Sequence, residues 1–265
     1  AENYLSANPH FAKSALSRFT PADFIALVDR YGIAWHEKTL GQLFCDGSSK
    51  QIVAMLLEEC AVGAVDTAFG QAPVVEHRDG SFRVSLGTDT AEARSLVLAS
   101  GGLSIPKLGA TSFAYDVARR FGLKIVEPRP ALVPLTLSGE QALFKTLSGV
   151  SSDVVAGAGK GSFREAALFT HRGLSGPAIL QVSSYWRHGG TVTVDFLPDL
   201  PAGWLRSAKR DDPRITLRTL LRRSLPDRLA ETLSNQIGLA SELGNAPDRS
   251  LEEAERRLAD WRFAP

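Results

Sequence analysis

The sequence has few cysteines, and charge of neither sign predominates. Its two cysteines, Cys45 and Cys60, cannot build a disulfide framework and do not form a Cys-x-x-Cys pair. The 30 basic and 29 acidic residues nearly cancel, so composition gives no electrostatic argument for a nucleic-acid or membrane partner. There is no apolar run long enough to span a bilayer and no signal peptide. These absences predict a protein of the reducing cytoplasm.

Several signatures of catalysis are also missing. A Ser-His-Asp order, a P-loop and a His-Glu-x-x-His motif do not occur. The five histidines show no metal-ligand spacing, so we expect no metal site. A Gly-x-Gly-x-x-Gly phosphate-binding fingerprint is absent near the start of the chain. What remains is an ordinary globular composition, 44% hydrophobic and 22% charged, in a chain long enough for two domains.

The most informative stretch is residues 96–115. An unbroken apolar run, residues 96–99, ends at Ser100 and the paired glycines Gly101 and Gly102. Apolar residues without alternation are typical of a strand buried on both faces in a parallel sheet. Paired glycines at its carboxyl end let another group approach the backbone, and ligands bind at that end in open α/β sheets. The alternative is a tight strand-to-loop connection that binds no ligand.

Thr111 precedes an amphipathic segment, residues 115–121, that ends at Gly122. Its hydroxyl is a candidate cap for a helix there. The free N–H groups at the start of such a helix attract phosphate. The sequence therefore predicts that this loop favours anionic ligands.

Patterning in the first half of the chain predicts the order helix, strand, hairpin, buried strand, helix. Residues 20–23 have the composition of a capping box, and Ser48 or Ser49 precedes a second helix. Residues 65–69 form an expected strand, and residues 78–80 are a hairpin-turn signal. The second helix has an expected apolar face formed by Ile52, Val53, Leu56 and Leu57. This order fits the later half of a doubly wound dinucleotide-binding sheet.

Prolines near residue 130 mark an expected domain boundary. Beyond it, residues 150–156 and 163–169 are expected strands, and Pro177 begins a helix. Residues 191–196 alternate as a further strand, and the pattern turns helical from Ile215. The second half is therefore expected to be a small sheet followed by helices.

Four stretches of the chain resemble segments of the YhiN/BaiN-type bacterial flavoproteins, which are usually described as NAD(P)/FAD-dependent oxidoreductases. Ser100 stands where that family usually has Thr, and Ser112 and Ala114 stand where glycines are common. The four stretches are residues 40–45, 99–111, 130–135 and 169–178.

The resemblance implies an α/β fold with two domains. Residues 1–132 would form a partial doubly wound, Rossmann-like FAD-binding domain, and residues 133–265 an inserted domain of mixed β-sheet followed by helices. Family members carry the glycine fingerprint before the matched region and a further flavin-contacting segment after it. We therefore expect the chain to be an internal piece of a longer protein and inactive alone.

The resemblance also implies FAD as the cofactor, a small-molecule substrate and NAD(P)H as a candidate reductant. The backbone at Gly101 and Gly102 is expected to contact the adenosine-diphosphate half of FAD. Ser100, Gly109 and Thr111 belong to the same matched loop and are expected cofactor-binding residues.

Two further segments carry expected cofactor contacts. Pro73 and Val74 occupy a position where main-chain groups often bind the adenine in this fold class; the alternative is an ordinary edge strand. Gln42 and Phe44 lie in a segment that resembles one close to the flavin ring in relatives.

Two residues are candidates for catalysis. Cys45 is either a redox thiol or a small buried hydrophobe. His171 is either an acid or base toward substrate, with Arg172 holding an anionic group, or part of a solvated connector between strand and helix. Neither alternative is excluded by the sequence.

The second half is locally basic. Interspersed acids favour a solvated helix face over a nucleic-acid module, so we expect no nucleic-acid and no membrane partner. Self-association remains open, because an incomplete sheet would expose apolar surface. The alternative to an oxidoreductase is a non-catalytic module of a larger flavoprotein. The basic residues are Arg206, Lys209, Arg210, Arg214, Arg218, Arg222 and Arg223.

Overall fold

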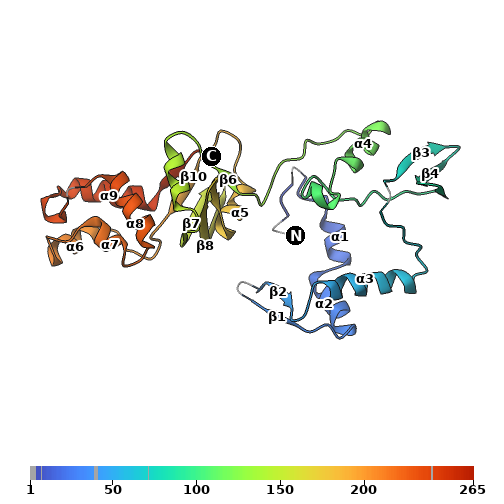
Figure 1. Ribbon diagram of the computed structural model, residues 1–265, viewed down its shortest axis with the longest axis horizontal. Coiled ribbons are helices and arrows are strands. Elements are labelled where there is room, and N and C mark those ends of the chain that lie inside the picture. The colour runs from blue at the N-terminus through green and yellow to red at the C-terminus, as the bar shows by residue number, and fades with distance from the viewer. Residues whose placement is uncertain (1–3, 7, 39–40, 71, 240) are drawn as a thin grey trace. The chain divides into compact units, whose positions relative to one another are not determined.

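The computed structural model describes residues 4–6, 8–38, 41–70, 72–239 and 241–265 (Figure 1). The chain divides into an N-terminal unit, Ala1–Ile125, and a C-terminal unit, Val126–Pro265. Leu40, the first residue of one resembling stretch, lies outside the described residues. The boundary expected after residue 132 separates a cofactor-binding domain from an inserted domain. The observed division separates compact units, so the expected domain boundary stays a prediction.

The N-terminal unit begins with helices and a hairpin. The capping box at the start of α2 is confirmed, because the N–H of Asp23 donates to Thr20 Oγ1 at 3.2 Å and the N–H of Thr20 donates to Asp23 Oδ2 at 2.7 Å. Two short strands after α2 form an antiparallel pair. The elements are α1 (Lys13–Arg18), α2 (Pro21–Arg30), β1 (Trp35–Glu37), β2 (Leu43–Cys45) and α3 (Lys50–Val62).

The core of this helical part is small. Val28, Ile33 and Met55 are its buried members. Of the apolar face expected on α3, Ile52 packs against this core. The rest of that face does not, since Val53 is 57% exposed and Leu56 is 45% exposed, whereas Met55 is 2% exposed. A helix buries the face that its neighbours cover, and α2 and the hairpin cover the Met55 side.

A three-stranded antiparallel sheet follows, in the order β3 (Val74–Arg78), β4 (Ser81–Leu86) and β5 (Asp89–Ala93). The hairpin turn at Asp79 and Gly80 is confirmed, with both residues at positive φ. Helix α4 (Phe113–Arg120) ends beside this sheet, where Phe121 and Phe82 stack edge to face with ring centroids 5.9 Å apart. The strand β5 was not expected from the sequence.

Two expected strands are wrong. Residues 65–69 and 96–99 have no strand structure, and Val97 is 84% exposed. An apolar run becomes a buried strand only if neighbouring strands pair with it. Within the described ranges, all paired strands are antiparallel and none pairs with either segment. The mixture of helices and sheets still agrees with the expected α/β class.

The C-terminal unit is built on a six-stranded antiparallel sheet in the order β11-β10-β7-β8-β9-β6. The long central pair is confirmed and differs from the prediction only at its ends. The strands are β6 (Leu135–Thr136), β7 (Ser151–Ala158), β8 (Gly161–Thr170), β9 (Gly173–Ser175), β10 (Val192–Asp195) and β11 (Trp261–Phe263).

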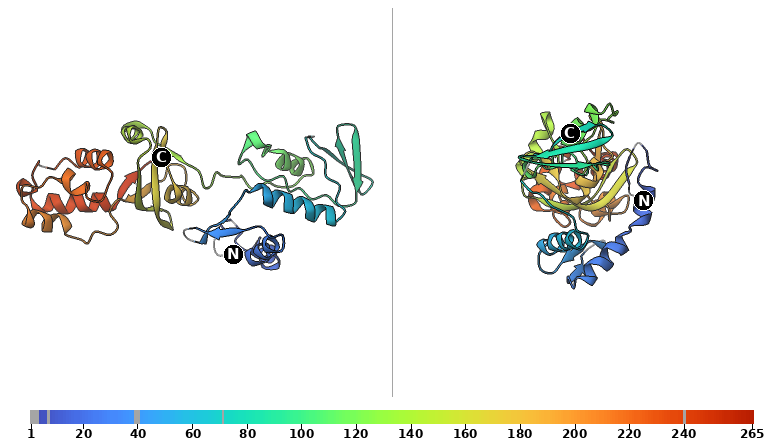
Figure 2. Two further views of the ribbon diagram at one scale, coloured as in Figure 1. Left: turned by 60° about the horizontal axis from the view of Figure 1, so that its bottom comes forward. Right: turned by 90° about the vertical axis from the view of Figure 1, so that its right-hand side faces the viewer.

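Helices α6 to α9 gather on one side of this sheet, and the C-terminus lies at the sheet itself (Figure 2). The helices expected after Pro177 and from Ile215 onward are confirmed, whereas α6 was not expected as a separate element. Phe144 lies in the core, with its ring centroid 5.1 Å from that of Phe263. The elements are η3 (Gly139–Leu147), α5 (Pro177–Ser183), α6 (Trp204–Asp211), α7 (Leu217–Leu221), α8 (Asp227–Ile237), η4 (Leu243–Asn245) and α9 (Asp248–Ala259).

Candidate functional site

The loop that carries Ser100, Gly101 and Gly102 has an accessible backbone. Gly101 has φ +74°, and no heavy atom lies within 4 Å of the position its Cβ would take. A Cβ at Gly102 would lie 3.1 Å from the hydroxyl of Tyr115. Among the described residues, the N–H groups of residues 100–104 donate no hydrogen bond to a protein acceptor. Unpaired N–H groups in an exposed loop can donate hydrogen bonds to the oxygens of a ligand.

Gly109 and Thr111 shape the rest of this loop. Gly109 has φ +86°, and its carbonyl accepts the N–H of Thr111 at 2.9 Å. The helix cap lies one residue later than predicted, at Ser112, and Thr111 Oγ1 accepts the N–H of Phe113 at 3.4 Å. Asp116 lies in the first turn of α4, so part of the positive end of the helix dipole already faces a carboxylate.

Pro73 and Val74 lie where β3 begins. Val74 pairs with Ser85 of β4 and is 54% exposed. Since β3 is an outer strand of its sheet, its other edge has no strand partner among the described residues. This geometry supplies free main-chain groups for an adenine and equally describes an ordinary edge strand.

The β1–β2 hairpin divides its side chains between two faces. His36 and Phe44 are register partners, and their rings stack with centroids 6.3 Å apart. The His36 Nδ1 atom lies 2.6 Å from Asp46 Oδ1, and Lys38 Nζ lies 4.7 Å from the centre of the Phe44 ring. Together with the preceding Gln42, these residues form a largely exposed polar and aromatic group. We call His36, Lys38, Phe44 and Asp46 the hairpin cluster.

Sequence reasoning identified Phe44 in this cluster but missed its charged members. The signal available was the alternation along two short strands, which places every second side chain on one face. That alternation needs the strand register, and the pairing of His36 with Phe44 fixes it.

Cys45 belongs to the opposite, inner face of the hairpin. It is partly buried and packs against the small core of Val28, Ile33 and Met55. Cys60 is a free thiol on α3. The contacts of Cys45 are those of a small hydrophobe, and its redox role stays a prediction.

His171 lies in the exposed turn between β8 and β9. Two glycines of the surrounding motif, residues 169–178, let its backbone approach neighbouring strands closely. A Cβ on Gly173 would lie 2.3 Å from the carbonyl oxygen of Leu135, and a Cβ on Gly176 would lie 2.7 Å from that of Ala166. The motif therefore has a packing role as a connector, and the catalytic role of His171 stays a prediction.

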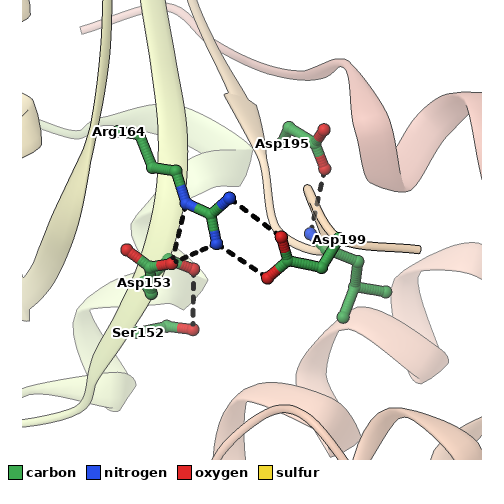
Figure 3. Close-up of polar contacts among 6 residues, drawn as sticks. Ser152, Asp153, Arg164, Asp195 and Asp199 are labelled. Carbon is green, nitrogen blue, oxygen red and sulfur yellow. Dashed lines mark hydrogen bonds and ion pairs between the residues drawn. The ribbon is translucent and has the colours of Figure 1, made fainter.

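An ion-pair network joins β7, β8 and the segment after β10 (Figure 3). Arg164 donates to both Asp153 and Asp199. The hydrogen bonds from Arg164 lower the pKa of Asp199. Burial raises the pKa of Asp195, an effect opposed by the hydrogen bond that its carboxylate accepts from the N–H of Leu197 at 2.9 Å. This network stabilises the sheet and faces no site described above.

Many of the basic residues of the C-terminal unit form ion pairs. Arg206 lies 2.9 Å from Glu252, and Lys209 lies 2.8 Å from Asp248. Arg222 lies 2.8 Å from Asp227. These pairs compensate part of the basic charge of the helices, and the choice between a solvated face and a nucleic-acid contact stays a prediction. None of the described helices is long and apolar enough to cross a membrane.

The described residues fit a dinucleotide in one respect. Residues 100–104 combine an open glycine backbone with N–H donors that face no protein acceptor. Such a loop suits the phosphate oxygens of a nucleotide cofactor.

The fold and these loops define a two-unit protein of the α/β class. The chain belongs to the HI0933-like protein family. A family model described as "HI0933-like protein Rossmann domain" matches residues 1–191, and one described as "HI0933-like protein barrel and H2TH domain" matches residues 129–265. These matches confirm the expected fold class and the resemblance on which it rested.

Two curated proteins are similar over almost the whole chain. The "Ribosomal RNA dihydrouridine synthase" of Escherichia coli is 45% identical over 99% of this chain and 67% of its own length. The protein of the same name from Haemophilus influenzae is 41% identical over 99% of this chain and 68% of its own length. The chain thus spans about two thirds of these relatives.

Proposed function

We propose that the protein is an FAD-dependent oxidoreductase that reduces a uridine of ribosomal RNA to dihydrouridine. The observation that carries this proposal is the 45% identity to the E. coli ribosomal RNA dihydrouridine synthase over 99% of the chain. The accessible loop at Gly101 and Gly102 supports the cofactor assignment. The proposed RNA substrate replaces the expected small-molecule substrate and the expected absence of a nucleic-acid partner, because the overall composition of a chain does not report a substrate that binds to a local surface.

Dihydrouridine differs from uridine by two hydrogens, added across the C5–C6 double bond of the base. The reaction therefore consumes one hydride and one proton. Reduced FAD, when bound, would supply the hydride, and we propose NAD(P)H as the external reductant that would return the oxidised flavin to its reduced form. The protein has to hold the cofactor, position the uracil ring and deliver the proton.

The loop of residues 100–111 is the proposed holder of the cofactor. The N–H groups at Ser100, Gly101 and Gly102 face no protein acceptor among the described residues and are proposed to bind the diphosphate. Gly109 and Thr111 fix the return of this loop toward α4 through their 2.9 Å backbone hydrogen bond. The edge of β3 at Pro73 and Val74 is the proposed adenine contact.

The hairpin cluster is the proposed contact with the reacting rings. Phe44 is 44% exposed and offers an aromatic face on which a planar ring can stack. His36 shares that face, and Asp46 fixes its ring orientation through the 2.6 Å contact at Nδ1. The other ring nitrogen, Nε2, then points away from Asp46, and it can donate a proton when the imidazole is in its protonated form. We assign His36 as the proton donor to the uracil and Asp46 as its positioning residue.

The test is dihydrouridine formation by the complete gene product. Ribosomal RNA from a strain that lacks the modification is incubated with protein, FAD and NAD(P)H, and the nucleosides are separated and identified by mass. The expected result is a uridine that gains two hydrogens. Absence of that product, with the E. coli relative active under the same conditions, would contradict the proposal.

A further inference from the structure

The C-terminal unit contains a groove of about 750 Å³ beside helix α6. Residues of α6, of the following loop and of the start of α9 line it. Three of the lining side chains are cations, Arg206, Lys209 and Arg210, and Asp248 is the single carboxylate among them. Glu252 pairs with Arg206 just outside this lining, so the three cations face two carboxylates and the remaining positive charge lies at Arg210.

The three cations differ in how much of their hydrogen-bonding capacity is used. Lys209 Nζ donates to the carbonyl of Ala246 and to Asp248 Oδ1, both at 2.8 Å, so it is fixed at the groove. Arg206 pairs with Glu252 at 2.9 Å. Arg210 meets no carboxylate among the described residues and donates only to the hydroxyl of Ser207, at 3.2 Å. A guanidinium has five N–H donors, so Arg210 retains several for a ligand.

The positive charge acts at one place. A hydrogen bond from Lys209 holds the pKa of Asp248 below its usual range, and the charges of Lys209, Arg206 and Arg210 lower it further. One carboxylate thus lies in the field of three cations. Because Glu252 compensates Arg206 and Asp248 pairs with Lys209, a further anion here would meet mainly the charge of Arg210.

The spacing of the two arginines suits a repeating anion. Arg206 and Arg210 are four positions apart on α6, so they share one face and lie about 6 Å apart along the helix axis. The backbone itself closes part of the groove, since a Cβ on Gly244 would lie 2.8 Å from the carbonyl oxygen of Pro213. Planar guanidinium forks bind phosphate in a two-pronged manner that ammonium groups do not provide.

We propose that this groove binds the phosphate backbone of RNA, with Arg206 and Arg210 contacting phosphates. Lys209 holds the lining of the groove together through its hydrogen bonds to Ala246 and Asp248. The inference rests on the proposed function, which gives the protein an RNA substrate, and adds an RNA contact on the C-terminal unit. It also explains how a chain of nearly neutral composition can hold a polyanion: the charge is local. Elsewhere in the basic region, Arg218 lies 3.2 Å from Glu231 and Arg222 lies 2.8 Å from Asp227. Among the lining cations, Arg206 and Lys209 are paired too, and Arg210 has no carboxylate partner among the described residues.

The test measures RNA affinity against salt. The protein is titrated into a fluorescein-labelled, single-stranded RNA oligonucleotide of ribosomal sequence, and anisotropy is followed at several KCl concentrations. In the Arg206→Gln/Arg210→Gln variant we expect at least about tenfold weaker binding, and a slope of log affinity against log salt that is smaller by about 1.4, which is 0.7 for each lost phosphate contact. Arg210→Gln alone removes no carboxylate pair, and its expected slope change is about 0.7.

The matched control removes two charges elsewhere on the same unit. Lys160 lies in the turn between β7 and β8, and Arg187 follows α5; both are exposed. We expect the Lys160→Gln/Arg187→Gln variant to keep the affinity and salt slope of the unmodified protein. An equal loss in both double variants would show a general charge effect and overturn the inference, as would unchanged binding in the groove variant.

Competitors identify the ligand. We expect unlabelled RNA to displace the probe and inorganic phosphate or polyglutamate to displace it only weakly. Stronger displacement by polyglutamate would point to an acidic protein partner and overturn the inference, and equal displacement by free phosphate would reduce the groove to an anion site. RNA binding through the groove without dihydrouridine formation would refute the proposed function alone. Dihydrouridine formation with unchanged RNA binding in the groove variant would refute the groove alone.

Discussion

Arg164 holds Asp199 with two parallel hydrogen bonds, 2.8 Å from Nη1 to Oδ1 and 2.7 Å from Nη2 to Oδ2 (Figure 3). The pair joins β8 to the segment that follows β10. Because the same guanidinium also binds Asp153, one side chain connects three parts of the C-terminal unit. Both partners are largely exposed, so solvent screens the interaction.

This pair predicts a dependence of stability on pH. The folded protein holds the pKa of Asp199 below that of the unfolded chain, because Arg164 favours the ionised carboxylate. The stabilisation is complete above about pH 4 and is lost as the pH falls through the lower, folded pKa. We therefore expect the free energy of unfolding of Asp199→Asn, measured in urea, to fall less steeply than that of the unmodified protein as the pH is lowered from about 4 to about 2. The control is Glu140→Gln, an exposed carboxylate with no ion pair among the described residues. Identical acid limbs for Asp199→Asn and the unmodified protein would contradict the assignment.

The glycines of the β8–β9–α5 connector predict a loss of stability. We expect Gly173→Ala and Gly176→Ala each to lower the free energy of unfolding by at least about 2 kcal/mol, because a Cβ would collide with neighbouring backbone. Gly189→Ala is the matched control, since Gly189 also has positive φ, +80°, but has no atom within 4 Å of its Cβ position. Its expected cost is about 1 kcal/mol. Equal costs at the three positions, measured by urea unfolding, would show that close approach is not the cause.

The capping box of α2 predicts a local effect in the N-terminal unit. Thr20→Ala removes the oxygen that accepts the N–H of Asp23, and we expect the unit to lose about 1 kcal/mol. Thr20→Ser keeps an acceptor at the same place and is expected to lose much less. Hydrogen exchange of the first-turn amides of α2 measures the difference. Equal exchange rates in the two variants would argue against a capping role.

The assignment of His36 predicts a separation of catalysis from binding. We expect His36→Gln to lower the rate of dihydrouridine formation by at least about 100-fold and to leave flavin retention unchanged. Asp46→Asn leaves the imidazole but loses the charged partner at 2.6 Å, so we expect a smaller loss and a changed pH profile. His10→Gln is the control, because His10 lies near α1 and outside the hairpin cluster. Full activity in His36→Gln would remove the residue from the mechanism.

The sequence predicted elements whose signals are local. The capping box at residues 20–23, the turn at Asp79–Gly80 and the alternating strands β7 and β8 each depend on neighbouring residues, and all three are present. The expected strand at residues 96–99 is absent, because only pairing with other strands gives an apolar run a sheet to join.

The candidate site shows the same limit. The open loop at Gly101 was predictable from two adjacent glycines, whereas the contact of His36 with Asp46 depends on pairing across a hairpin. Helix α6 was missed because its sequence, WLRSAKRD, carries few apolar residues for a periodic pattern. Its packing against α9, through the carboxylate of Glu255 on the N–H groups of Gly203 and Leu205, depends on residues far along the chain.

The measurement that tests the account most directly is the visible absorption spectrum of the protein after incubation with FAD and gel filtration, with the 265-residue chain beside the complete gene product. We predict that the complete gene product retains the flavin bands. If the chain alone also retains them, the loop of residues 100–111 holds the cofactor without a Gly-x-Gly-x-x-Gly fingerprint. A complete gene product that emerges from the column without flavin would contradict the central claim that this protein is a flavoenzyme.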